Sequence, residues 1–141
     1  MKNLLKASVG FSAGWTAAMV ASLCCSVAVF PHHLQVPTLF GLSHLALSGA
    51  LDGAALPLFV TWLVSLRYAL SPRAATVISV AVVCPILSWR LYRVWDNYGA
   101  FPNWMPQLEL LVLLPTCVAA GYVFGFVFNR VGPGVSLRGA A

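Results

Sequence analysis

The feature that most constrains this chain is the near absence of charge over long apolar stretches. Residues 7–30 contain no charged side chain and would extend about 36 Å as an α-helix, enough to cross a bilayer with some tilt. Of the 141 residues, 60% are hydrophobic and only 8% are charged, whereas a soluble domain has about 25% charged residues. So few charges cannot cover a water-soluble globule, and the sequence therefore predicts a polytopic membrane protein.

Further apolar stretches predict an all-α integral membrane fold in a single domain, residues 1–141. We expect a small bundle of about four transmembrane helices plus a short interfacial or re-entrant helix. Ser71-Pro72 and the loop 97–106 separate the later spans, because proline favours the first turn of a new helix. The last residues, 131–141, are predicted to be a mobile tail. The predicted spans cover residues 7–30, 54–71, 74–95 and 107–129, and the short helix covers about 38–50.

The region 36–66 leaves two interpretations open. It contains one acidic residue, Asp52, and no basic one. A single helix would be about 46 Å long and would hold Asp52 near the middle of the membrane, where a charge is costly. We therefore favour a short helix, a turn near Asp52-Gly53 and then a span. The alternative is one long kinked helix.

Basic residues predict the topology. The net charge is +5, and the basic residues lie between the apolar runs without forming a cluster that would bind nucleic acid. Arg90 and Arg93 fall on one side of the predicted membrane, and we place both termini on the other, inner side. The N-terminus lacks the pattern of a transit peptide, and we expect a bacterial inner membrane or an organellar inner membrane. The basic residues on the inner side would be Lys2, Lys6, Arg67, Arg73, Arg130 and Arg138.

Small residues recur at every fourth position of the first span. They are Gly10, Gly14, Ala18, Ser22 and Ser26. A face of this kind lets another helix approach closely, so that van der Waals contact and serine hydrogen bonds hold the pair together. We expect this face to pack on a helix of the same chain or of a partner.

The same spacing of small residues occurs in the last span, at Gly121 and Gly125. A single GxxxG pair is a weaker signal than five small positions in a row. We include both glycines among the residues expected to pack against another helix.

Five polar residues are candidates for a site or a ligand contact: His44, Asp52, Glu109, Arg90 and Arg93. The two acids lie near membrane depth, where ionisable residues are functional candidates by default. A second interpretation is that each acid stabilises the start of a helix, because the helix dipole favours negative charge there. For the two arginines we expect a place at the headgroup level, beside tryptophans.

Nothing in the sequence predicts a metal site, a prosthetic group or catalysis. The four cysteines lie in apolar runs without metal-ligand spacing. His44 has no partner histidine in the third or fourth span, so we do not expect a haem or a pigment there. The motifs of phosphate-binding loops, zinc proteases and serine hydrolases are missing from the sequence. We therefore expect no enzyme activity and no cofactor, but we do expect bound lipid.

These observations favour a non-catalytic accessory subunit that packs into and stabilises a larger membrane complex. The first span would be its main docking face, and other membrane subunits and membrane lipids would be its partners. A respiratory or photosynthetic assembly is the expected host. The alternative is a small oligomeric transporter or channel that uses Asp52 or Glu109.

Overall fold

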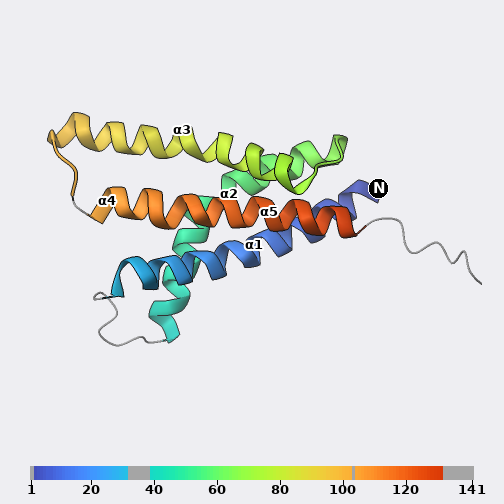
Figure 1. Ribbon diagram of the computed structural model, residues 1–141, viewed down its shortest axis with the longest axis horizontal. Coiled ribbons are helices and arrows are strands. Elements are labelled where there is room, and N and C mark those ends of the chain that lie inside the picture. Colours follow the sequence, from blue (N-terminus) through green and yellow to red (C-terminus); the bar gives the residue numbers. More distant parts are fainter. Residues whose placement is uncertain (1, 32–38, 103, 132–141) are drawn as a thin grey trace, which may run out of the picture.

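The computed structural model describes residues 2–31, 39–102 and 104–131, and within this part of the chain every regular element is helical (Figure 1). The predicted tail and His32-His33 lie outside the described residues. The last three elements follow one another without a break and form one long helix over residues 104–130, which we call the last rod. The described residues thus form four long helical rods, each long and apolar enough to cross a membrane. The elements are α1 (Lys2–Val29), α2 (Leu39–Arg67), α3 (Pro72–Tyr98), α4 (Trp104–Gln107), the π-helix η2 (Leu108–Leu113) and α5 (Leu114–Arg130).

Helix α5 lies between α1 and α3 and packs against both, while α2 crosses this layer obliquely (Figure 1). Side chains on α2 and α5 fill the centre, where Leu58 and Phe124 are fully buried. A second, smaller cluster joins α3 to the last rod through Val83, Leu113 and Cys117. In each helix the buried positions recur every three or four residues, as expected for rods packed side by side.

The start of α1 and the end of α5 lie at the same end of the bundle. The amide of Asn3, at the start of α1, donates a hydrogen bond to the carbonyl oxygen of Leu66 at 3.4 Å. The amide of Asn129, near the end of α5, donates to the carbonyl oxygen of Leu70 at 2.6 Å. We call this the basic end. Its charged residues whose side chains the structure describes are Lys6, Arg67, Arg73 and Arg130.

The region 36–66 differs from the favoured expectation. The division into a short helix, a turn and a span is wrong, because α2 continues without a break from Leu39 to Arg67. The glycines that suggested a turn are contact positions instead: a side chain on Gly49 would collide with Ser22 of α1, and one on Gly53 would meet the carbonyl oxygen of Leu113 at 3.0 Å. Small residues are required there by packing, and the helix can continue.

The connections on either side of α3 follow from local chemistry. Ser71 accepts a hydrogen bond from the backbone N–H of Ala74 and Pro72 occupies the first turn, as the Ser71-Pro72 pair predicts. Gly99 ends the helix with φ of 66°, a conformation that suits glycine because it has no Cβ. The chain can therefore reverse sharply and return as the last rod.

Candidate functional site: a charge cluster between α2, α3 and η2

The small-residue face of α1 is used inside the chain. Gly10, Gly14, Ala18, Ser22 and Ser26 are all buried. A Cβ on Gly14 would lie 2.9 Å from the carbonyl oxygen of Ala120 and 2.8 Å from a methyl group of Leu58. The hydroxyl of Ser22 donates to the carbonyl oxygen of Leu45 at 3.1 Å. This face joins α1 to α5 and α2, so a partner subunit has no access to it.

Gly121 and Gly125 have the same role between α5 and α3. A Cβ on Gly121 would lie 2.6 Å from the hydroxyl oxygen of Ser79, and a Cβ on Gly125 would lie 2.6 Å from the Cα of Pro72. Both distances are too short for a real contact, so only glycine fits this helix crossing.

Three charged side chains from three elements meet in the other half of the bundle. The Nε of Arg90 on α3 lies 3.1 Å from Oε1 of Glu109 on η2. Its Nη1 lies 4.0 Å from Oδ2 of Asp52 on α2. We call these three residues the charge cluster. One arginine is shared by two carboxylates, so the cluster carries a net charge of −1 when all three groups are ionised.

The two carboxylates have different surroundings. Glu109 is completely buried, and neither of its side-chain oxygens has a hydrogen-bond partner beyond the ion pair. The side chain of Asp52 is 56% exposed and that of Arg90 is 36% exposed. The cluster therefore has an enclosed end at Glu109 and an open end at Asp52, on the flank of the bundle between α2 and α3.

Glu109 lies in a π-helix, which is rare and is often found at functional sites. The backbone N–H of Leu114 donates to the carbonyl oxygen of Glu109, five residues earlier. The cause is Pro115, which has no N–H to continue the α-helical pattern and whose ring would crowd the carbonyl of Leu111. The wider turn relieves this conflict within the segment that carries Glu109.

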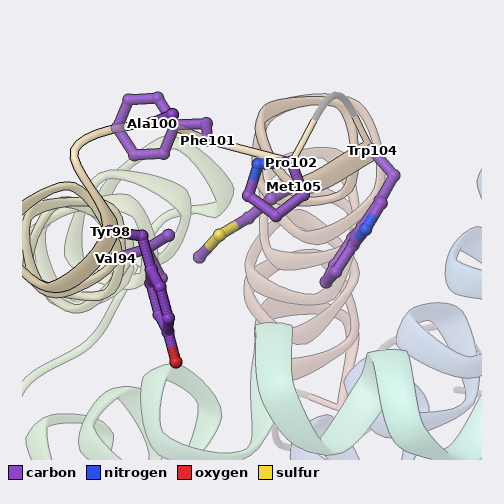
Figure 2. Close-up of a pocket in the computed structure, with 7 residues that line it drawn as sticks. All are labelled: Val94, Tyr98, Ala100, Phe101, Pro102, Trp104 and Met105. Carbon is purple, nitrogen blue, oxygen red and sulfur yellow. The ribbon is translucent and has the colours of Figure 1, made fainter.

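An apolar pocket of about 550 Å³ is lined by the end of α3, the loop that follows it and α4 (Figure 2). Among its lining residues are Val94, one turn after Arg90, and Met105, one turn before Glu109. The other lining residues are Tyr98, Ala100, Phe101, Pro102 and Trp104. Met105 lies in the first turn of the last rod and is nearly buried. The pocket therefore lies at the end of the bundle nearer to the charge cluster.

The other polar candidates do not join the cluster. His44 is exposed on the second turn of α2. Arg93 is exposed, and its guanidinium carbon lies 5.9 Å from the centre of the Trp89 ring. Among the described residues no group of three or more histidine, cysteine or acidic side chains could hold a metal ion.

One expectation for the charged residues is wrong. Asp52 does not stabilise a helix start, because it lies in the middle of α2. The side chain of Arg90 reaches the buried Glu109 and does not stand alone beside Arg93. The attraction between opposite charges in a poorly solvated place favours this pairing.

The pairing of Arg90 with Glu109 was missed, although the sequence held a signal for it. Arg90 precedes the loop 97–106 by seven residues and Glu109 follows it by three, so an antiparallel pair of helices brings them within about one helical turn of the same depth. Opposite charges at matching positions of a helical hairpin predict an ion pair. Asp52 comes from a distant part of the chain, and no comparable signal exists for it.

The comparisons with known proteins are negative throughout. No protein-family model matches the chain, and neither the curated proteins nor the solved structures contain a match.

Proposed function

We propose that this chain is a non-catalytic membrane subunit that docks into a larger membrane assembly through the flank between α2 and α3. The supporting observation is the open end of the charge cluster, where Asp52 in the middle of α2 and Arg90 in the second half of α3 are 56% and 36% exposed on long apolar helices. Charged groups facing lipid at this depth are costly and are usually covered by protein or water. A neighbouring helix that covers the flank removes this cost.

The chemistry of the flank indicates what the partner helix presents. Leu56 lies one turn after Asp52 and is half exposed, as is Phe59 close to it. An apolar surface with one negatively charged cluster suits a transmembrane helix that is mostly apolar and carries one basic or hydrogen-bond-donating side chain. The proposed surface for a partner subunit is therefore the flank between α2 and α3, and not α1. A respiratory or photosynthetic host stays a prediction, as does bound lipid.

A matched pair of substitutions tests this proposal. Leu56 and Val20 are exposed to similar extents, 51% and 58%, but Val20 lies on α1. Leu56→Trp should reduce the size of the assembly recovered in gentle detergent, and Val20→Trp should leave it unchanged. Size-exclusion chromatography with mass spectrometry gives both results and identifies the partners. A native chain that migrates as a monomer, or equal loss with both variants, would contradict the proposal.

The second candidate function is a small oligomeric transporter or channel, with Asp52 and Glu109 on its path. Its specific support is that both carboxylates share one arginine within helices that can cross a membrane. Flux through liposomes containing the purified protein should then depend on pH and be lost in Asp52→Asn or Glu109→Gln. The matched control is Asp96→Asn, which changes the remaining acidic residue, exposed near the end of α3. Flux that is unchanged in all three variants would exclude this candidate.

A further inference from the structure

We propose that Glu109 reversibly binds a proton and that Arg90 then exchanges Glu109 for Asp52 as its ionic partner. This inference deepens the transport candidate, but it does not require flux, because a proton can bind without any solute crossing the membrane. The ligand is a proton from water, and its binding converts the Glu109 carboxylate into a neutral carboxyl group. No covalent bond other than the new O–H bond is formed or broken.

The first argument is the charge balance in a poorly solvated place. Glu109 is fully buried, and its one charged contact is the Nε of Arg90 at 3.1 Å. Asp52 competes for the same guanidinium from 4.0 Å away. Two carboxylates that share one cation leave one negative charge uncompensated, and a single proton makes the cluster neutral.

The second argument is the geometry of Arg90, which already lies between both carboxylates. Its Nε faces Glu109 while its Nη1 is directed to Asp52, from the same planar group. When Glu109 becomes neutral, the attraction on the Nε side falls and the attraction on the Nη1 side remains. A small side-chain movement then shortens the contact to Asp52, without any rearrangement of the helices.

The third argument is that the open end offers a proton a route to the site in the isolated chain, where no partner helix covers it. Asp52 and Arg90 are half exposed, whereas Glu109 is enclosed, so the accessible carboxylate lies on the approach to the buried one. Glu109 also lacks hydrogen bonds to its oxygens among the described residues, and a carboxylate without donors is less well stabilised than one at a helix start.

Few other ionisable groups lie near Glu109. Helix α4 contains none, and α1 and α5 carry their described charges at the basic end, on Lys6 and Arg130. The ionisable residues of α1 in this half are Cys24 and Cys25, and α5 contributes Cys117, two turns further along. On α2, beyond Asp52, the ionisable residue in this half is His44, which is exposed. On α3, beyond Arg90, the ionisable residues in this half are all exposed: Cys84, Tyr92, Arg93, Asp96 and Tyr98. The charged groups that act on Glu109 are therefore Arg90 and Asp52.

Infrared difference spectroscopy of the purified protein in lipid nanodiscs tests the proposal, with pH as the variable. The sequence contains only three acidic side chains, so the carbonyl band of a protonated carboxyl group can be assigned by single substitutions. The native protein should show a band that appears reversibly as the pH is lowered. Glu109→Gln should abolish it, and Asp96→Asn should leave it unchanged. Asp52→Asn should retain the band but shift its titration midpoint, because Arg90 then has one carboxylate partner.

Two results would overturn the proposal: no titrating band in the native protein, or the same band in Glu109→Gln. Labelling of the buried Cys117 shows whether each variant is folded. If Glu109→Gln fails to fold, Arg90→Lys provides the second variant. It keeps the positive charge but loses the planar group that reaches both carboxylates, so the midpoint should shift, and an unchanged midpoint would contradict the proposal. A titrating band together with absent flux would reject only the transport candidate.

Discussion

The two halves of the bundle hold their helices together in different ways. At the basic end, α5 meets α1 and α3 through glycines whose backbones touch neighbouring atoms directly, as at Gly14 and Gly125. In the other half, glycines also meet neighbouring helices, at Gly49 and Gly53, but the ion pairs of the charge cluster connect α2, α3 and η2 in addition. Close packing fixes one geometry, whereas an arginine between two carboxylates permits two. The comparison indicates that the basic end is the rigid part and that the cluster is the part that can change.

The largest loss of stability is expected when a side chain is added at a glycine contact in the half that contains the basic end. Gly125→Leu should lower the free energy of unfolding by about 3 kcal/mol, because the new side chain meets the backbone of Pro72, which cannot move aside. The rate at which the buried Cys117 reacts with a thiol reagent in detergent should rise accordingly. Val118→Leu, on the exposed face of the same helix, is the control. Equal labelling rates in both variants would show that the crossing is not tight.

A smaller effect is expected from breaking the charge cluster. Arg90→Leu leaves Glu109 buried without its charged partner, and we expect a loss of about 2 kcal/mol in unfolding free energy. This is below the roughly 3–5 kcal/mol typical of fully buried pairs, because Arg90 is partly exposed. Adding Glu109→Leu should recover most of the loss, and unfolding titrations of the two single variants and the double variant measure it. If the double variant is less stable than Arg90→Leu, the ion pair does not explain the loss.

The smallest effect concerns a neutral contact between α2 and α3. Thr61 donates to the carbonyl oxygen of Pro57 at 2.8 Å, so the 3.1 Å contact between the hydroxyls of Thr61 and Ser79 has Ser79 as its donor. A double-mutant cycle with Thr61→Val and Ser79→Ala should give a coupling of about 0.6 kcal/mol, which is typical of hydrogen bonds between membrane helices. A coupling as large as that of Arg90 with Glu109 would remove the energetic distinction between neutral and charged contacts.

The sequence was sufficient for the helical class and for the start of α3, because apolar length and Ser71-Pro72 act locally. It was insufficient for α2, since the glycines that suggested a turn are contact positions for Ser22 and Leu113, which lie in distant parts of the chain. The small-residue face of α1 could be recognised, but its partner could not. Spacing shows that a helix can approach closely, and it does not show which helix does so.

The hairpin that turns at Gly99 has a consequence for how the chain enters the membrane. On its own, a helix with Arg90 within its apolar stretch would insert less readily, since a charged residue costs about 2.5–3.5 kcal/mol at the centre of a span and less towards the end, where Arg90 lies. The next rod brings Glu109 to the same depth shortly afterwards during synthesis. Inserted as a pair, the two helices present one neutralised contact in place of two isolated charges. The hairpin would thus enter a membrane as one unit, with Arg90 and Glu109 already paired.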